Sequence, residues 1–512
     1  MLGLACLVLG LVPGAVLPQK RAEGAFEELE RELRDARPEK RRSAVRALAR
    51  SGTREAWLLV MGALADPASE VGDAAQLALA GITDEQVLAE LLGRAGLRAK
   101  EPVVRGRSAE AVGRLAVPLD AVELVECLGG EPEETRLLLW SLERLARSRH
   151  LEGDRERACR AVEREASSGR DGGVRAAAFV ALAALVKDAG EEARASAVRA
   201  VERACDDRDP RVRCAVLIAA AGLDPPRALA WSRRAAADPA VAVRLAAVEG
   251  LAGLRSLPGV LALIATLESE KTPSVRDALV AALQQLSGLK HRADPRPWRD
   301  WAQKLPPDWR PGFGLSQPPE PAAGDEHAAQ WRTSARFAGL PVTSLHVAFL
   351  IDFSGSMWMP MADGRLPKDQ VDVRMREVLE GLPEDAWFNV IPFAHEPAPW
   401  SEKLVQARRS NVQRAIADFE GCQLHGKGNF FDAAVLALED TEVDTIVTLT
   451  DGVPTGGTHS DMDLIVPLLL ERNRFRRVRF DAVLVDAPGG ARRRWEELSR
   501  ASGGRCLAID KP

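Results

Sequence analysis

The chain has 512 residues, 46% of them hydrophobic and 28% charged, and its formal net charge is −5 at pH 7. This length exceeds what one hydrophobic core usually supports, so more than one domain is expected. The composition excludes intrinsic disorder, and the lack of a basic excess argues against a nucleic-acid partner.

The chain begins with an uncharged apolar run, residues 2–16, followed by polar residues from Gln19 onward. Such a run is typical of a secretory signal and is too short to span a bilayer comfortably. We therefore expect residues 1–19 to be a signal peptide. The mature protein would then have no membrane span and would be exported to the periplasm, the cell envelope or the extracellular space. The alternative is a buried amino-terminal helix in a cytoplasmic protein.

Residues 25–290 are rich in Ala, Leu, Arg and Glu, with apolar residues at helical spacing. A turn, often Asp-Pro, recurs before Val-Arg and an Ala-rich helix. The arginines of the clearest copies are 38, 31 and 32 residues apart, at Arg175, Arg213, Arg244 and Arg276. Weaker copies place Arg42, Gly72, Arg105 and Arg136 at the same position, which makes about eight helical pairs.

This pattern resembles HEAT repeats, in which each helix pair is too small to bury its apolar face alone and stacks on its neighbours. It predicts an all-α solenoid with an extended interaction surface. An irregular helical bundle is the alternative, but it would not place Val-Arg after a turn at such regular intervals.

Between residues 291 and 340 the composition shifts to Pro, Trp, Gly and charged residues. Trp298, Trp301 and Trp309 punctuate a short helix that we expect to cap the last repeat. Residues 317–326 are typical of a flexible joint, so the domain boundary is predicted there.

From residue 341 to 512, apolar strands alternate with amphipathic helices. The predicted strands are 346–352, 387–393, 444–451, 478–486 and 504–510, and the predicted helices are 368–382, 408–419 and 431–439. Such alternation predicts an α/β doubly wound (Rossmann-like) fold, with a parallel sheet covered on both faces. Ligands of these folds bind beyond the carboxyl ends of the strands.

Two predicted strands end in oxygen-bearing side chains. Asp352, Ser354 and Ser356 end the first strand in the sequence DFSGS, and Asp451 ends a later strand in the sequence TDG. Hard cations such as Mg²⁺ prefer oxygen ligands and keep some waters, which suits a set of hydroxyls and carboxylates. Taken singly, each segment is equally well explained as a strand end with a turn cap.

Together the segments resemble the metal-ion-dependent adhesion site (MIDAS) of von Willebrand factor type A (VWA) domains. The resemblance implies that Ser354 and Ser356 bind one divalent cation directly, Mg²⁺ or alternatively Mn²⁺ or Ca²⁺. Asp352 and Asp451 would hold it largely through water. An open coordination position would then accept an acidic group of a protein partner.

One element of the family pattern differs in the sequence GKGNFFDA. Gly428 stands where the family usually has Thr, and Asn429 is the candidate to supply an oxygen instead. The sequence at 335–357 is also similar to the start of the type A domain in planctomycete-type bacterial proteins that join HEAT-like repeats to such a domain.

The expected function is therefore that of a non-enzymatic, exported scaffold that recognises a protein partner through a divalent cation, with the repeats as a second interaction surface. The alternatives are a metal-independent scaffold with a degenerate site, which Gly428 favours, and an adaptor subunit of an ATPase-partnered or chelatase-like machine. No hydrolase GxSxG or P-loop occurs. His395, His425 and His459 lack zinc-ligand spacing and are expected on the surface. The basic clusters at 472–479 and 492–494 are expected to be solvated helix faces.

Overall fold

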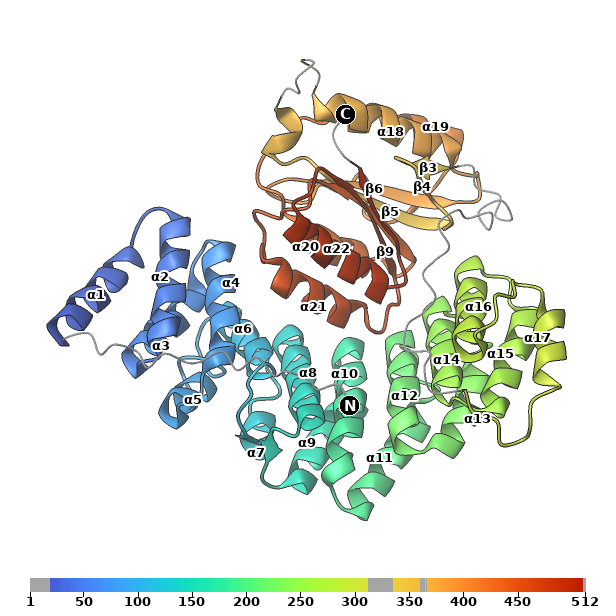
Figure 1. The fold of residues 1–512 in the computed structure, drawn as a ribbon, viewed down its shortest axis with the longest axis horizontal. Helices are drawn as coiled ribbons and strands as arrows, with labels where there is room; N and C mark the ends of the chain where they lie inside the picture. The colour runs from blue at the N-terminus through green and yellow to red at the C-terminus, as the bar shows by residue number, and fades with distance from the viewer. Residues whose placement is uncertain (1–18, 312–334, 360–363, 365, 510–512) are drawn as a thin grey trace, which may run out of the picture.

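The computed structural model describes residues 19–311, 335–359, 364 and 366–509. The predicted signal peptide lies outside this range, apart from Gln19, which begins the first helix. Figure 1 shows an arc of paired helices with an α/β domain seated in its hollow. None of the helices in the described part of the chain is long and apolar enough to cross a bilayer.

The arc is the predicted helical solenoid. Its helices are α1 (Gln19–Glu32), α2 (Pro38–Ser51), α3 (Arg54–Gly62), α4 (Ser69–Ala78), α5 (Glu85–Leu92), α6 (Pro102–Val112), α7 (Ala121–Val125), α8 (Pro132–Ser148), α9 (Arg155–Ser168), α10 (Gly172–Leu185), α11 (Glu191–Ala204), α12 (Pro210–Leu223), α13 (Pro225–Ala235), α14 (Val241–Gly253), α15 (Leu257–Ser269), α16 (Pro273–Ser287) and α17 (Pro295–Ala302). Short strands β1 (Leu119–Asp120) and β2 (Leu151–Glu152) pair in parallel between repeats.

The recurring arginine is at the fourth position of helices α2, α6, α10, α12, α14 and α16 and ties its repeat to the next. Arg213 donates to the backbone oxygen of Asp207 in its own turn (2.8 Å) and pairs with Asp238 of the next turn (2.7 Å). Arg244 repeats the arrangement with the Asp238 backbone oxygen and Glu270. Equivalent pairs are Arg41–Asp66, Arg105–Glu134 and Arg175–Asp207. The arginine that recurs in the sequence therefore forms a ladder of ion pairs between successive repeats.

Two of the weaker predicted copies are displaced by one residue. Arg41, not Arg42, occupies the ladder position of α2, and Thr135, not Arg136, occupies that of α8. In these two copies no Val-Arg pair follows the turn, so the alignment had no anchor there. Gly72 does occupy this position in α4, without an arginine.

Helix α17, at the end of the solenoid, is the cap that was predicted from the three tryptophans. Trp298 is fully buried in one apolar cluster with α14–α16, and its indole N–H donates to the Arg292 backbone oxygen (2.8 Å). Trp301 packs edge-on against Trp298 and Trp309. The predicted joint at 317–326 lies outside the described residues.

The second domain begins earlier than the predicted residue 341. A hairpin of β3 (Arg336–Phe337) and β4 (Leu340–Pro341) turns at Gly339, whose φ of +92° favours glycine. Phe337, within the hairpin, is fully buried in the core of this domain. Residues 335–340, which were assigned to the linker, therefore belong to the second domain. The sequence did not indicate this, because such a short hairpin cannot be distinguished from a turn.

The second domain is built on a six-stranded sheet in the order β10-β9-β8-β5-β6-β7, parallel except for β7. Its strands and helices are β5 (His346–Asp352), α18 (Pro367–Gly381), β6 (Trp387–Phe393), β7 (Val405–Gln406), α19 (Arg409–Glu420), α20 (Phe430–Glu439), β8 (Thr445–Thr450), α21 (Met462–Asn473), β9 (Arg479–Val485), α22 (Gly489–Ala501) and β10 (Cys506–Ile509). The short edge strand β7 was not predicted, and helices α21 and α22 were expected only as helix faces at the basic clusters 472–479 and 492–494, without bounds. Pro467 lies inside α21, and a proline within a sequence usually indicates that a helix is interrupted there.

Side chains of the central strand alternate between the two faces of this sheet. Phe349 and Ile351 of β5 pack with α18 and α19, whereas Ala348 and Leu350 join the apolar cluster that contains α20–α22. Both faces are therefore covered by helices, as the continuous apolar strands predicted.

The α20–α22 face of the sheet is turned toward the solenoid (Figure 1). One apolar cluster runs from the solenoid into α20–α22, and every residue of α10 is buried. Ion pairs cross the same interface between Arg136 and Glu471, and between Arg474 and Glu143 (2.8 Å). The two domains thus share a packed, charged interface.

The interface corrects the expectation for the basic cluster at 472–479. Arg472, Arg474 and Arg477 pair with acidic residues of the solenoid rather than facing solvent. The sequence could not distinguish these possibilities, because the acidic partners lie hundreds of residues earlier in the chain.

Candidate cation site

The candidate site lies where β5 and β8 end at the carboxyl edge of the sheet. Asp352 is the last residue of β5, and Asp451 directly follows β8. The two strands are hydrogen-bonded neighbours, but the chain continues from them in opposite directions, to β6 and to β9. This is the topological switch point at which α/β sheets bind ligands.

Hydrogen bonds join the four predicted side chains from β5 and β8. Asp352 Oδ1 accepts from the Ser354 backbone N–H (2.8 Å), the Ser354 and Ser356 hydroxyls lie 3.2 Å apart, and Ser356 donates to Asp451 Oδ2 (2.6 Å). The fold therefore brings Asp352, Ser354, Ser356 and Asp451 together. Their role as cation ligands stays a prediction.

The site is buried at one side and open at the other. Asp352 and Ser354 are 2% and 8% exposed, whereas Ser356 and Asp451 are half-buried. Burial raises the pKa of Asp352 to about 6, although hydrogen bonds from Thr450 and Ser354 oppose the shift. A ligand approaching this site would meet Ser356 and Asp451 first.

The donor set fits a hard divalent cation. All four side chains offer oxygen, the ligand atom that Mg²⁺ and Ca²⁺ prefer. Among the described residues, no Lys, Arg or His side chain forms an ion pair with Asp352 or Asp451. Burying carboxylates without a counter-charge is costly, and a bound cation would supply that charge.

The sequence analysis missed two residues that support Asp352 and Asp451. The Thr450 hydroxyl donates to Asp352 Oδ2 (2.7 Å) and accepts from the Gly452 N–H (2.9 Å). Gly452 has φ +90°, and a Cβ there would lie 2.8 Å from the Ala487 Cβ. The sequence TDG could have indicated both residues, because the residues on either side of Asp451 each have a structural role.

Gly428 lies beside the site with space for a larger side chain. A Cβ at this position would be 3.6 Å from Asp352 Oδ2 and from the Ser354 Cβ, which is ordinary van der Waals contact. The backbone of Gly428 exchanges two hydrogen bonds with Thr455, one from its N–H to Oγ1 (2.8 Å) and one from the Thr455 N–H to its oxygen (3.0 Å).

Asn429 is not part of this hydrogen-bonded group. Its amide oxygen accepts from the Asp432 N–H and caps α20, and its amide nitrogen donates to the His395 backbone oxygen and to Asp432. The geometry therefore favours a capping role, and its role as a ligand stays a prediction. Lys427 is exposed and packs against Gly456.

His395, His425 and His459 do not gather into a cluster of metal-binding side chains. No group of three or more His, Cys, Asp or Glu that could hold a metal occurs within the described residues. His425 stacks on Trp358 (ring centroids 4.1 Å apart) and is exposed, as expected. His459 was expected on the surface but is buried, because it pairs with Asp73 of the solenoid (2.7 Å).

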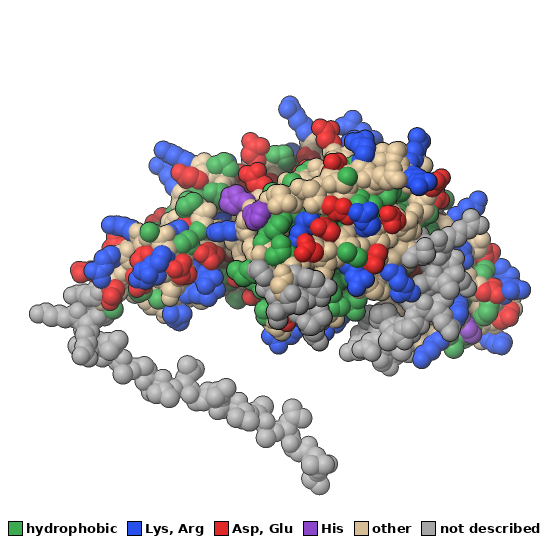
Figure 2. Space-filling view, turned by 90° about the horizontal axis from the view of Figure 1, so that it is seen from above, with side chains coloured by type: hydrophobic (Ala, Val, Ile, Leu, Met, Phe, Trp, Pro, Cys, Tyr) green, Lys and Arg blue, Asp and Glu red, His purple; other side chains and the backbone are tan. Residues whose placement is uncertain are grey.

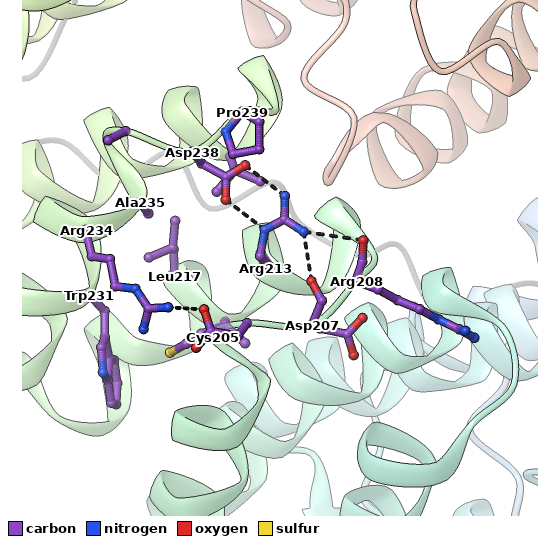
Figure 3. A pocket seen from close by; sticks show the side chains of 14 residues that line it. Cys205, Asp207, Arg208, Arg213, Leu217, Trp231, Arg234, Ala235, Asp238 and Pro239 are labelled. Atoms are coloured by element: carbon purple, nitrogen blue, oxygen red, sulfur yellow. Dashed lines mark hydrogen bonds and ion pairs between the residues drawn. The ribbon is translucent and has the colours of Figure 1, made fainter.

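A separate cavity of about 420 Å³ lies between the α11–α12 and α13–α14 repeats (Figure 3). Its charged lining is largely self-paired, with Arg213 bound to Asp238 and Arg234 to Asp206. Trp231 and Leu217 contribute apolar surface. Because its charged groups already have partners, this cavity is a weaker candidate for ligand recognition than the cation site.

Figure 2 shows how charged side chains are distributed over one face of the molecule. On the described part of the face in Figure 2, basic and acidic side chains are interspersed rather than gathered by sign. This distribution matches the small net charge and differs from the basic face that phosphate binding needs.

The chain matches the HEAT-repeat family over residues 26–113 and 198–284. It is 32% identical over 130 residues to inter-alpha-trypsin inhibitor heavy chain 4 of Mus musculus, which is 23% of this chain and 13% of that protein. It is 30% identical over 126 residues to inter-alpha-trypsin inhibitor heavy chain H3 of Homo sapiens, which is 22% and 14%. The chain thus spans only a small part of these curated relatives.

Among solved structures, the chain is similar to a von Willebrand factor type A protein from Catenulispora acidiphila. The TM-score is 0.28, with 16% identity over 34% of this chain and 40% of that chain. The family match confirms the predicted HEAT-like solenoid, and the strand order and the motifs after β5 and β8 agree with the predicted type A domain. This combination is that of a protein-interaction scaffold.

Proposed function

We propose that this protein is a non-enzymatic interaction scaffold whose type A domain binds one divalent cation through Asp352, Ser354, Ser356 and Asp451. The cation, Mg²⁺ or alternatively Mn²⁺ or Ca²⁺, would in turn bind an acidic side chain of a protein partner. The observation that supports this most is the pair of carboxylates that lack a cationic partner among the described residues and are linked by hydrogen bonds through Ser354 and Ser356.

The exposed surroundings of the site favour a partner whose acidic residue is flanked by apolar ones. Met359 and Val453, which follow the two site segments, are 68% and 44% exposed. The Val453 N–H donates to Asp451 Oδ1 (3.3 Å), so its apolar side chain lies beside the half-buried, open part of the site. The solenoid would provide the second interaction surface, and the apolar run at residues 2–16 favours export.

Isothermal titration of the full chain with Mn²⁺ or Mg²⁺ tests cation binding. We expect one site in the wild type and none in Asp352→Ala. Asp463→Ala is the matched control, because it removes an exposed carboxylate of the same domain and should leave binding unchanged. A wild type that binds no cation, or an Asp352→Ala variant that binds as well, would refute the proposal.

A metal-independent scaffold is the second candidate, because Gly428 supplies no side-chain oxygen and the Asn429 amide caps α20. Capture of a partner from envelope extract with and without EDTA separates the two. The cation proposal expects a protein that EDTA elutes and that Asp352→Ala fails to capture. A partner that both conditions retain would favour the metal-independent scaffold.

A further inference from the structure

A fully buried carboxylate of the solenoid binds the segment of the second domain that precedes α21. Asp73 of α4 has no exposed surface and lies among apolar neighbours of its own helix, including Val71 and Ala75. Its hydrogen bonds cross to the other domain, with His459 Nδ1 on Oδ1 (2.7 Å) and the Ser460 N–H on Oδ2 (2.7 Å). An unpaired carboxylate would be costly there, so these contacts are what make Asp73 tolerable in α4.

The bound segment leads into α21. The Asp461 N–H also donates to Asp73 Oδ2 (3.0 Å), and Asp461 is the N-cap of α21. A negative charge is favourable at this end of a helix, where backbone N–H groups lack intrahelical partners. Arg107 of α6 reaches the same segment, since it donates to the Thr458 backbone oxygen (3.3 Å) and lies 3.9 Å from Asp73.

The segment held by Asp73 is the far end of the loop that begins with Asp451. Between these ends, the Thr455 hydroxyl and N–H form hydrogen bonds with the backbone of Gly428 beside the site, and the Thr458 N–H donates to Asp432 (3.1 Å). The loop is therefore fixed at the cation site, at its middle and at the solenoid. Loss of the contact at one end would release part of the constraint on the other.

The solenoid departs from its own repeat where it meets this loop. Gly72 occupies the ladder position that carries arginine in most other repeats, and the Arg107 guanidinium fills the space of its side chain. A Cβ on Gly72 would lie 1.4 Å from Arg107 Nη1. Arg107 then donates to the Leu64 backbone oxygen (2.7 Å) as well as to the loop. Glycine in place of arginine at position 72 therefore makes room for Arg107 to reach the second domain.

We infer that Asp73 is a positioning residue of the cation site, through which the solenoid holds the loop that carries Asp451. The inference rests on the proposed function of that site. Outer residues that orient the ligands of a metal commonly change its affinity by about 10- to 100-fold when they are replaced. Cation binding by the type A domain thus depends on a residue of the repeat domain.

The test measures Mn²⁺ binding to the full chain by isothermal titration in wild type, Asp73→Ala, Asp73→Asn and Glu143→Gln. Glu143 is the matched control, because it is a similarly buried carboxylate that crosses the same interface to Arg474 but does not contact the loop. We expect at least tenfold weaker binding for Asp73→Ala and less than a twofold change for Glu143→Gln. Asp73→Asn should fall between wild type and Asp73→Ala, since its amide oxygen still accepts from a backbone N–H.

Hydrogen exchange of the loop supplies a readout that does not need the cation. Amides of residues 452–461 should exchange faster in Asp73→Ala than in wild type, with no such change in Glu143→Gln. Equal Mn²⁺ affinity in wild type and Asp73→Ala would overturn the inference alone, as would equal losses in Asp73→Ala and Glu143→Gln. A wild type without Mn²⁺ binding would instead refute the proposed function and, with it, this role of Asp73.

Discussion

Replacing Gly428 with threonine should strengthen cation binding. The position has room, because a Cβ would lie 3.6 Å from Asp352 Oδ2 and 3.7 Å from Oδ1, and no atom approaches closer. The backbone of Gly428 is outside the left-handed region, and its two hydrogen bonds to Thr455 use backbone groups that threonine retains. A hydroxyl attached to this Cβ would lie next to Asp352, where it can replace one water of the bound ion.

The size of the gain follows from exchanging that water for the hydroxyl. Releasing an ordered water returns up to about 2 kcal/mol. Fixing the threonine rotamer takes back about 0.5–1 kcal/mol. The net of about 1 kcal/mol corresponds to about fivefold tighter binding.

Isothermal titration of Mn²⁺ into wild type, Gly428→Thr and Gly428→Val measures the effect. Valine has the shape of threonine without the oxygen, so it controls for the added bulk and for the loss of glycine flexibility. We expect tighter binding in Gly428→Thr only. Equal affinities of the Thr and Val variants would show that residue 428 does not face the ion.

Three further predictions concern the interface and the cap. Glu471→Ala should lower the free energy of unfolding by about 2 kcal/mol in chemical denaturation, because it removes one of the two carboxylates that pair with the buried Arg136. Acid should loosen domain docking, as measured by small-angle scattering. Although burial opposes the shift, Arg136 and Arg472 hold the pKa of Glu133 below its usual 4.5. The stabilisation is therefore complete above about pH 4.5 and is lost as the pH falls through the lower folded pKa. Trp298→Ala should cost about 3–5 kcal/mol in the same denaturation assay, because its indole is fully buried in the cap; a loss below about 1 kcal/mol would contradict the capping role.

The candidate site was predictable from sequence to the extent that it depends on short segments. Asp352, Ser354 and Ser356 lie within one turn, and Asp451 ends a strand whose neighbour in the sheet follows from the fold class. Asn429 was a less secure candidate, because an amide at a helix start serves equally well as a cap. Sequence spacing does not distinguish these two uses.

The amino-acid sequence by itself determined the two kinds of domain, because helical repeats and apolar strands are periodic patterns set within a few tens of residues. It also determined the loops that carry the candidate oxygen ligands. Only the tertiary structure decided that Arg474 faces Glu143, that Asp73 binds the loop of the cation site, and that the Phe337 hairpin joins the second core. These contacts join residues distant in the chain through burial and charge, and no local spacing encodes them.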